Sequence, residues 1–398
     1  MISVPDAIDR LLAAVEPQAP VEVPWSQALG RTLAGDVRAD RDAPSADRSA
    51  MDGFAVRSED LASPGTTLSV AGEVRAGVGA GATRLARGTC VRITTGAVVP
   101  EGADAVVMIE RTVEDPGSGT VRFEVAAAPG ENVRRRGEDV REGDVVIPRG
   151  AILRAPEIAV LAAVGRTSVP VVPAPRIAVL STGDEVVEID RPVAPHQVRN
   201  SNAAMLLALL EAQGLAGAYL GIAGDERGKL DALLEEGLRH DVLVVTGGVS
   251  VGTYDLVADA LSRHGATVLF HKVAMRPGKP ILAAMCGRTL VLGLPGNPVS
   301  AFTAFHVFAA PALRKLAGEA HPVRPSLLPK LTASIVRRPG RRTYALGSLD
   351  PSRTAVTPVV SASSGDLFAL SRANAFIVVE EGERPLQAGE HVEVLAWE

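Results

Sequence analysis

The feature that most constrains the fold is the alternation of strand and helix patterns across residues 171–322. Apolar segments such as RIAVLS and DVLVV have the composition of buried strands. Amphipathic segments such as ERGKLDALLEEGLRH lie between them and have helical spacing. Alternation of this kind predicts a parallel sheet covered by helices. We therefore expect an α/β domain here, ending in one long helix over residues 297–318.

The segments on either side of this region predict β-structure. Short β-branched segments separated by Gly and Pro predict a β-rich region over residues 57–137. A second set, after a Pro-rich linker, predicts a small all-β domain over residues 323–398. Near the N-terminus we expect an amphipathic helix capped by Ser3, followed by a long polar loop over residues 40–57.

Composition excludes several classes of protein. The formal net charge is −5, which argues against a protein that coats nucleic acid. The apolar runs are far shorter than the ~20 residues of a membrane span, and no signal-peptide pattern is present. The two cysteines, Cys90 and Cys286, predict a reducing, cytoplasmic setting. Because aromatic residues make up only 3% of the chain, we expect no pocket with aromatic walls.

Two adjacent carboxylates, Asp184 and Glu185, follow the first predicted strand of the α/β region. Parallel sheets bind ligands at the carboxyl ends of their strands. Adjacent carboxylates in that position suit Mg²⁺, which prefers oxygen ligands. An exposed acidic turn at the start of a helix explains the same pattern equally well.

A glycine-rich turn follows a second strand, with Thr246, Gly247, Gly248 and Ser250 between strand and helix. Backbone N–H groups in such a turn can bind an anion. The pattern is neither a Walker A loop nor G-x-G-x-x-G. A tight turn between strand and helix, with no ligand, is the alternative interpretation.

Two proline-containing segments add cations and a helix start. MRPGKP holds Arg276 and Lys279, which suit an oxyanion such as phosphate, sulfate or molybdate; two solvated charges are the alternative. LPGNPVS predicts a helix capped by Asn297, with Pro298 in its first turn. The preceding Pro295-Gly296 suggests a backbone shaped to meet a ligand.

Charged residues also occur before the α/β region. Asp52 precedes a glycine in SAMDGFAV. In RRRGEDV, Glu138 and Asp139 follow Arg134–Arg136, a pattern more typical of solvated ion pairs than of catalytic groups. The histidines show no zinc-binding spacing.

Taken together, these segments resemble one known family. In order along the chain they are SAMDGFAV, RITTGAVVPEGADAVVMIE, RRRGEDV, IAVLSTGDE, TGGVSVGTYD, MRPGKP and GLPGNPVSAF. They are similar to the motifs of the MoeA family, the molybdopterin molybdenumtransferases, which includes the E domain of gephyrin. Each motif alone is weak, but the whole ordered set is specific.

The resemblance implies a multidomain α/β plus β subunit of four parts. These are a segmented N-terminal domain (1–50 and 138–170), a β-rich domain (51–137), a central parallel α/β molybdopterin-binding domain (171–322) and a small, barrel-like C-terminal β domain (323–398). It also implies an elongated homodimer with active sites shared between subunits. The upstream molybdopterin adenylyltransferase is a candidate further partner.

The resemblance further implies the last step of molybdenum cofactor biosynthesis. The substrates are adenylylated molybdopterin and molybdate, and Mg²⁺ assists hydrolysis of the adenylate. AMP leaves, and the dithiolene sulfurs bind molybdenum. This reaction fits the motifs, because phosphoanhydride hydrolysis needs charge neutralisation and an oriented water.

Functional residues are transferred from the family's motifs by position. The implied catalytic residues are Asp52, Thr95, Asp139, Glu185, Asp225 and Asp255. Metal binding is implied for Asp184 and Glu185. The implied pterin-binding residues are Ser181, Thr182, Gly183, Thr246, Gly247, Gly248, Ser250, Pro295 and Pro298. The implied molybdate-binding residues are Arg276, Lys279, Ser300, Arg342 and Ser364.

Two departures from the family pattern stand out. Arg276 occupies a position where Lys is common. RRTYALGSL places Leu346 or Gly347 where a second Arg is common. This looser segment motivates an alternative hypothesis, a gephyrin-like scaffold that binds proteins with weak or no transferase activity. A phosphate-handling enzyme of another pathway is a third hypothesis, but it leaves SAMDGFAV and RITTGA unexplained.

Overall fold

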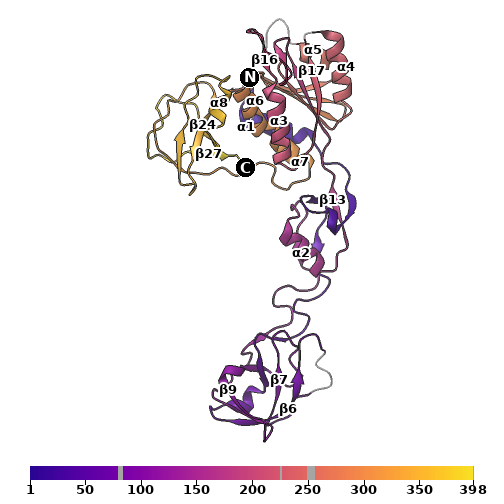
Figure 1. Cartoon of the computed structure of the whole chain (residues 1–398), viewed down its shortest axis with the longest axis vertical. Helices are drawn as coiled ribbons and strands as arrows, with labels where there is room; N and C mark the ends of the chain where they lie inside the picture. The colour runs from indigo at the N-terminus through magenta and orange to yellow at the C-terminus, as the bar shows by residue number, and fades with distance from the viewer. Residues whose placement is uncertain (79–83, 225, 249–255, 398) are drawn as a thin grey trace. The chain divides into compact units, whose positions relative to one another are not determined.

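The computed structural model describes residues 1–78, 84–224, 226–248 and 256–397 (Figure 1). The chain divides into two compact units. The first unit comprises Met1–Gly35, Arg149–Arg154 and Ser168–Glu398, and the second comprises Asp36–Pro148 and Ala155–Thr167. The division into four domains at the boundaries given above stays a prediction.

The first unit contains the predicted α/β sheet, with strand order β17-β14-β18-β22-β21-β19. Its strands are β14 (Ile177–Thr182), β17 (Gly217–Ala223), β18 (Val242–Thr246), β19 (Thr267–His271), β21 (Leu282–Cys286) and β22 (Thr289–Leu294). Four adjacent strands of this sheet run parallel to one another, in the order β17, β14, β18 and β22. Every residue of β14, β18 and β22 is buried, as expected for strands with helices on both faces.

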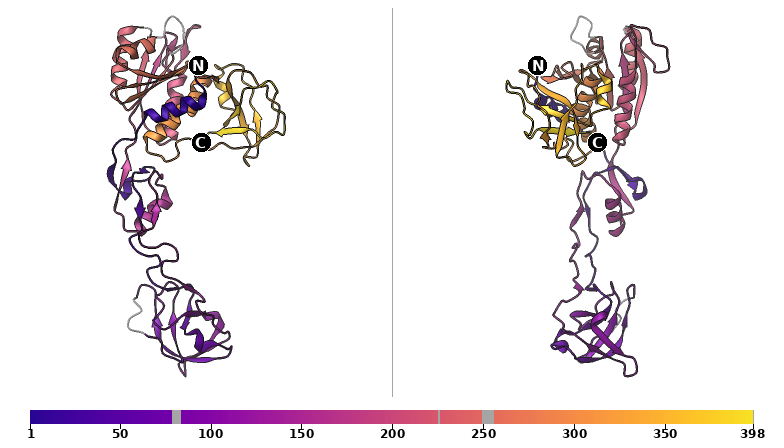
Figure 2. Two further views of the ribbon diagram at one scale, coloured as in Figure 1. Left: turned by 180° about the vertical axis from the view of Figure 1, so that it is seen from behind. Right: turned by 60° about the vertical axis from the view of Figure 1, so that its left-hand side comes forward.

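Alternate residues of these strands pack against two different helix layers, seen from two further directions in Figure 2. Val179, Val244 and Leu292 belong to the larger core, whereas Leu180 and Val245 belong to the smaller one. The helices of the larger core are α1 (Val4–Ala14), α3 (Ser201–Ala212), α6 (Pro298–Ala304) and α7 (Ala310–Leu316). Those of the smaller core are α4 (Arg227–Gly237) and α5 (Leu256–Arg263). The alternation confirms a sheet with one helix layer on each face.

β19 and β21 are the exception to the parallel arrangement. β21 is antiparallel to β22, and β19 is antiparallel to β21. Cys286 and Thr289 face each other across a turn that holds only Gly287 and Arg288. A parallel connection needs a crossover of a dozen or more residues, so this short turn requires a hairpin.

The predicted long helix at 297–318 is interrupted. A π-helical segment, η4 (Phe305–Ala309), separates α6 from α7. Pro311 accounts for the interruption, because it lacks the N–H that would continue the α-helical ladder. Asn297 occupies the predicted N-cap position, but its side chain makes no capping bond there.

A second sheet of the first unit forms the C-terminal β region, with order β23-β25-β24-β26-β27. Its strands are β23 (Lys330–Leu331), β24 (Arg342–Leu349), β25 (Ala355–Pro358), β26 (Ala375–Val379) and β27 (Glu393–Ala396). The short strand β20 (Met275–Arg276) pairs with β24, with Arg276 opposite Thr343. This pairing joins MRPGKP to the C-terminal sheet. The short helix α8 (Leu367–Leu370) precedes β26.

Smaller elements complete the first unit. Ser3 caps α1 as predicted, accepting a hydrogen bond from the Asp6 N–H at 3.2 Å. β1 (Val21–Pro24), β13 (Ser168–Val172) and β2 (Thr32–Leu33) form a small sheet in the order β1-β13-β2, and β15 (Val186–Val187) pairs with β16 (Val198–Arg199). Among the described residues, no helix has both the length and the apolar character needed to cross a membrane.

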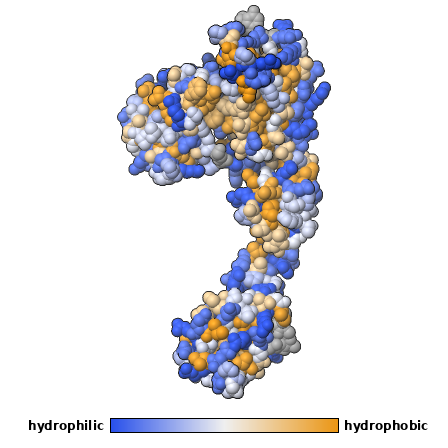
Figure 3. Space-filling model, in the orientation of Figure 1, coloured by the Kyte–Doolittle hydropathy of each residue, from blue (hydrophilic) through white to orange (hydrophobic). Residues whose placement is uncertain are grey.

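The second unit is β-rich, as predicted. Its main sheet has the order β8-β5-β7-β6-β10-β9. The strands are β5 (Gly53–Val56), β6 (Thr67–Val74), β7 (Thr89–Ile93), β8 (Ala105–Met108), β9 (Thr112–Asp115) and β10 (Thr120–Phe123). Two ribbons pair β4 (Arg48–Ser49) with β11 (Val133–Arg134) and β3 (Val37–Arg38) with β12 (Val145–Ile147), and α2 (Ala155–Ala163) packs on β12. Figure 3 shows polar and apolar residues mixed over the visible face of each unit.

The expected uninterrupted loop over 40–57 is wrong, because the short strand β4 lies within it and β5 lies at its end. β5 is buried and pairs with both β7 and β8. A Cβ on Gly53 would lie 1.9 Å from the Val107 carbonyl oxygen, so this close approach requires glycine. Asp52 is thereby held at the start of a central strand.

Candidate active site

A cavity of ≈ 800 Å³ lies at the carboxyl ends of β14, β18 and β22. Of the predicted pterin-binding residues, it is lined by Ser181, Thr182, Thr246, Gly247, Gly248, Pro295 and Pro298. Gly183 instead lines a neighbouring cavity. The structure therefore brings most of the predicted pterin set into one site, which we call the strand-end cavity.

The two glycines of the loop after β18 lie against the end of β14. A Cβ on Gly247 would lie 2.6 Å from the Thr182 carbonyl oxygen, and one on Gly248 would lie 2.7 Å from Thr182 Oγ1. Both residues have positive φ, 86° and 63°, which glycine adopts without strain. Close packing therefore explains the glycines, as a tight turn would, and it also places the loop on the cavity wall.

Asn202, in the first turn of α3, ties two walls of the strand-end cavity together. Its Nδ2 donates to Thr246 Oγ1 at 2.8 Å and to the Gly296 carbonyl at 2.7 Å. Its Oδ1 is buried and has no hydrogen-bond partner among the described residues. Sequence reasoning missed this residue, because a polar residue near a helix start is explained by capping alone.

A chain of hydrogen bonds behind the cavity wall runs from the buried Ser181 and Asn200 to the more exposed Tyr219 and Glu188. Ser181 Oγ donates to Asn200 Oδ1 at 3.0 Å, and Asn200 Nδ2 donates to the Tyr219 hydroxyl at 2.8 Å. The Tyr219 hydroxyl donates in turn to Glu188 Oε1 at 2.9 Å. Burial, followed by the Glu188 hydrogen bond, raises the pKa of Tyr219 to about 12. Tyr219 therefore stays protonated and holds Asn200, the N-cap of α3, in place.

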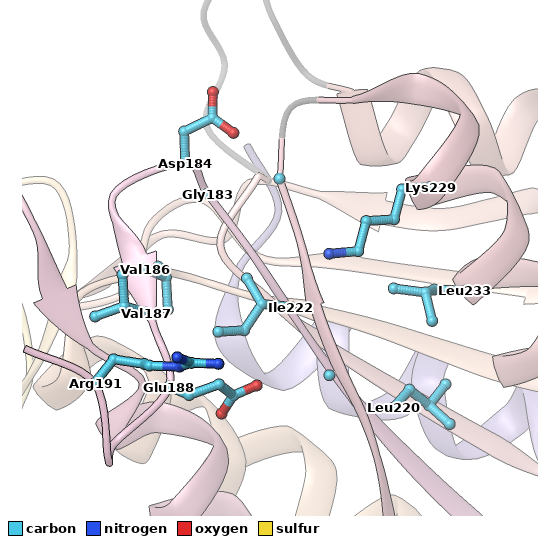
Figure 4. Close-up of a pocket in the computed structure, with 12 residues that line it drawn as sticks. Gly183, Asp184, Val186, Val187, Glu188, Arg191, Leu220, Ile222, Lys229 and Leu233 are labelled. Carbon is cyan, nitrogen blue, oxygen red and sulfur yellow. The ribbon is translucent and has the colours of Figure 1, made fainter.

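The two adjacent carboxylates of the STGDE turn line different cavities. Glu185 lines the strand-end cavity. Asp184 lines a second cavity of ≈ 540 Å³ beside β17, together with Glu188, Arg191 and Lys229 (Figure 4). Within the described residues, no cluster of three or more His, Cys, Asp or Glu could hold a metal ion. Mg²⁺ commonly needs only one or two protein carboxylates plus substrate phosphates, a requirement that Glu185 fits.

Two cationic side chains, Arg276 and Arg341, lie close together near β20, and Lys279 follows Arg276 by three residues in the chain. Arg276 on β20, Lys279 three residues later and Arg341 just before β24 have no carboxylate partner within the described residues. Partial burial and the nearby charge of Arg276 lower the pKa of Arg341. Pro280, directly after Lys279, lines the strand-end cavity. We call these three residues the cation cluster.

Arg342, predicted for molybdate, is placed differently. It forms an ion pair with Glu380 and lines a third cavity that shares no lining residue with the strand-end cavity. Successive residues of a strand point to opposite faces, which separates Arg342 from its neighbour Arg341. The structure thus places Arg341, which sequence reasoning did not single out, beside Arg276.

The two predicted serines lie at the first turn of α6. Ser300 is buried within this helix. Ser364 accepts a hydrogen bond from Asn297 Nδ2 at 2.9 Å through its Oγ, and its carbonyl accepts from the Val299 N–H at 3.1 Å. Gly365 lines the strand-end cavity. The C-terminal β region thereby contributes to the cavity wall.

In the second unit, Asp52 and Thr95 are in direct contact. Asp52 Oδ1 accepts from the Thr95 backbone N–H at 2.6 Å and from Thr95 Oγ1 at 2.9 Å. These two hydrogen bonds lower the pKa of Asp52 below its usual value. The structure thus brings together two residues that were predicted separately, and Thr95 orients the Asp52 carboxylate.

Asp139 belongs to an ion-pair network in the second unit. Arg134 donates to both carboxylate oxygens of Asp139 at 2.5 Å. Arg135 pairs with Asp47, and Arg136 pairs with Asp42. All three arginines are exposed, so the solvated ion pairs predicted for RRRGEDV are confirmed. The Asp139 carboxylate is therefore already paired with the guanidinium of Arg134.

Thr95→Val is expected to raise the pKa of Asp52 toward its usual 3.8, because one of the two hydrogen bonds is lost. A depressed carboxyl pKa contributes stability above its unfolded-state value, and this stability is lost as pH falls through the folded-state value. The variant should therefore lose its protection against acid at a higher pH than the wild type. Carbon-13 NMR titration of Asp52 measures the shift. Thr112→Val, which removes a hydroxyl bonded to the Ile109 carbonyl, is the matched control, and an equal effect of both variants contradicts the assignment.

Three predicted residues, Asp225, Ser250 and Asp255, lie outside the described residues. Asp52, Thr95 and Asp139 belong to the second unit, and the remaining predicted residues belong to the first.

Comparison with known proteins gives one family along the whole chain. Residues 2–165 match the MoeA N-terminal region (domain I and II), 178–315 a probable molybdopterin binding domain, and 330–397 the MoeA C-terminal region (domain IV). Molybdopterin molybdenumtransferase 2 of Mycobacterium tuberculosis is 38% identical over 94% of both chains. The chain belongs to the MoeA family. Molybdopterin molybdenumtransferase of Bacillus subtilis, another member, is 36% identical over 94% of this chain and 90% of its own.

Solved structures of the MoeA family have the same fold. A molybdopterin biosynthesis MoeA protein from Pyrococcus horikoshii superposes with a TM-score of 0.83 at 29% identity, covering 100% of this chain and 99% of that one. A second structure from the same organism gives a TM-score of 0.85 at 27% identity, with full coverage of both chains. The multidomain α/β plus β class predicted from the sequence is confirmed. The scaffold alternative receives no support from the relatives, which are named as transferases.

Proposed function

We propose that the protein inserts molybdenum into adenylylated molybdopterin with release of AMP, the last step of molybdenum cofactor biosynthesis. The observation that carries this proposal is the strand-end cavity with the cation cluster beside it. The cavity wall supplies threonine hydroxyls and a glycine loop for the pterin phosphate. The cations lack carboxylate partners among the described residues and suit a tetrahedral dianion such as molybdate.

Within the site, each group has a distinct task. Thr182 and the loop of Gly247 and Gly248 hold the pterin phosphate. Arg276, Lys279 and Arg341, with Ser300 and Ser364 at the first turn of α6, hold molybdate. Glu185 is the carboxylate that would hold Mg²⁺ at the phosphoanhydride. Bound Mg²⁺ would supply charge neutralisation for hydrolysis, in which water attacks the adenylate phosphorus, the bond from this phosphorus to the oxygen of the pterin phosphate breaks, and AMP is released.

The assembly is part of the same proposal. Asp52, Thr95 and Asp139 belong to the second unit, and we propose that a homodimer completes each site from both subunits. Docking of the upstream molybdopterin adenylyltransferase would deliver the adenylate. A cytoplasmic location fits the two free cysteines.

The decisive experiment measures AMP release from adenylylated molybdopterin, with and without molybdate, at fixed Mg²⁺. We expect release that requires the enzyme and rises with molybdate. Tight pterin binding with no AMP release in either condition contradicts the proposed transferase activity.

Variants of two neighbouring arginines test, in the same experiment, which of them binds molybdate. Arg341→Ala is expected to raise the molybdate concentration for half-maximal release by about 10-fold, the effect of losing one charged hydrogen-bonding group. Arg342→Ala, the matched control, loses the ion pair with Glu380 and the hydrogen bond with Tyr344, and it should leave this concentration nearly unchanged. If Arg342→Ala raises this concentration more than Arg341→Ala does, Arg342 rather than Arg341 binds molybdate.

A further inference from the structure

A third cavity, of ≈ 730 Å³, lies between the helices of the larger core and the C-terminal sheet. Its walls come from α3, η4 and α7 on one side and from β24, β26 and β27 on the other. We call it the C-terminal cavity, and Gln213, His306, Tyr344, Phe376 and Trp397 are among its lining residues. It shares no lining residue with the strand-end cavity, so the proposed reaction leaves it unexplained.

Aromatic rings gather at this cavity, contrary to the expectation from a chain with 3% aromatic residues. The rings of His306 and Trp397 are stacked, with centroids 6.2 Å apart and planes at 19°. Phe376 lies edge-on to Trp397, with centroids 5.3 Å apart. Tyr344 packs edge-on against Phe376. Phe376 and Tyr344 are themselves buried, so His306 and Trp397 present the aromatic surface, which suits a flat, aromatic occupant.

Three lining residues carry buried polar atoms that have no hydrogen-bond partner in the part of the chain that the structure describes. These atoms are Gln213 Oε1, His306 Nε2 and Trp397 Nε1. Unpartnered buried polar atoms are rare in folded proteins, because each costs free energy. Because these three atoms belong to residues that line one cavity, they indicate that the cavity takes a hydrogen-bonding ligand. Gln213 Oε1 can only accept and Trp397 Nε1 can only donate, whereas His306 Nε2 can do either.

The helix that carries His306 is irregular at this residue. His306 and Val307 lie in the π-helical segment η4, and Pro311 lies one turn later on the same wall. π-helical insertions occur frequently at functional sites. Burial lowers the pKa of His306 to about 4, so its ring is neutral at physiological pH. At His306 the wall therefore offers a neutral hydrogen-bonding group, beside charged side chains that also line the cavity, namely Arg314, Arg324, Arg342 and Glu393.

From this geometry we propose that the C-terminal cavity binds a planar nitrogen heterocycle whose edge carries both a donor and an acceptor. Purine and pterin rings share that chemistry. Stacking on the aromatic wall would hold the ring plane, and the three unpartnered atoms would pair with its edge after small side-chain rotations. A purely apolar occupant would leave all three atoms unpaired.

Tryptophan fluorescence tests the proposal in the full-length protein. The only two tryptophans are Trp25, which is 50% exposed, and Trp397. In a Trp25→Phe background, Trp397 is the only reporter. We expect saturable quenching by guanosine or by pterin, and comparison of the two probes identifies the preferred ring system. Ligand in the strand-end cavity would not contact Trp397.

Two variants distinguish binding in this cavity from other effects. Gln213→Leu and His306→Phe should each weaken binding about 10-fold, because each removes one hydrogen bond to the ring edge. Gln387→Leu, which replaces an exposed glutamine outside the cavity, is the matched control and should bind like the parent. If His306→Phe fails to fold, Gln213→Leu alone decides. Absence of quenching by both probes at millimolar concentration overturns the proposal, as does unchanged binding by Gln213→Leu.

Discussion

Gly247→Ala is expected to weaken binding of the pterin substrate roughly 10- to 100-fold, which corresponds to about 1.4–2.8 kcal/mol. The added Cβ would lie 2.6 Å from the Thr182 carbonyl oxygen and 2.8 Å from its Oγ1. Neither distance is tolerated by a real Cβ, and the carbonyl belongs to a central strand that cannot yield. The loop after β18 must therefore move, and the strand-end cavity loses one wall. Isothermal titration with adenylylated molybdopterin measures the loss.

Gly265→Ala is the control variant. It separates the effect of backbone strain from the effect of the close contact with Thr182. Gly265 has φ of +74°, close to the +86° of Gly247, but a Cβ there would meet nothing within 4 Å. An L-residue in the left-handed conformation costs about 1–2 kcal/mol at either position. Both variants should thus lose stability in thermal unfolding, while only Gly247→Ala should lose pterin affinity. Equal affinities for the two variants contradict a pterin site at this loop.

The sheet and the loops that line the cavity at its carboxyl edge were predictable because their signals are local. β14, β18 and β22 are continuous apolar segments, which is the pattern of strands buried on both faces. The glycine turn after β18 was predictable from composition alone. The family motifs pointed to Asp52 and Thr95 separately, whereas their contact across 43 residues became visible only in the structure.

The parts that sequence reasoning missed depend on tertiary packing. Asn202 joins two loops through hydrogen bonds that exist only in the folded sheet. Arg341 and Arg342 are adjacent in sequence, and only the register of β20 on β24 places one beside Arg276. A low aromatic content gave no sign that His306, Phe376 and Trp397 would gather at one cavity. Composition gives the number of aromatic residues, but only tertiary packing determines which of them lie close together.

Glu185→Gln is expected to lower the rate of AMP release on the order of 100-fold, because a metal-held phosphoanhydride depends on several kcal/mol of charge stabilisation. The amide keeps the size of the side chain and removes its charge, so cavity shape and pterin binding should change little. Single-turnover AMP release at saturating substrate separates the chemical step from binding. Raising Mg²⁺ should restore part of the rate if the lost charge acts by holding the metal.

Asp184→Asn is the matched control, since it removes the same charge from the adjacent residue. Asp184 lines the cavity beside β17, whereas Glu185 lines the strand-end cavity. A Cβ on Gly224 would lie 2.6 Å from Asp184 Oδ1, so this carboxylate is directed toward the end of β17. We expect its loss to change AMP release by less than about 5-fold, the scale of a charge acting at a distance through solvent. Equal losses in both variants would show that both carboxylates bind the metal, and a larger loss in Asp184→Asn would move the reacting phosphate to the cavity beside β17.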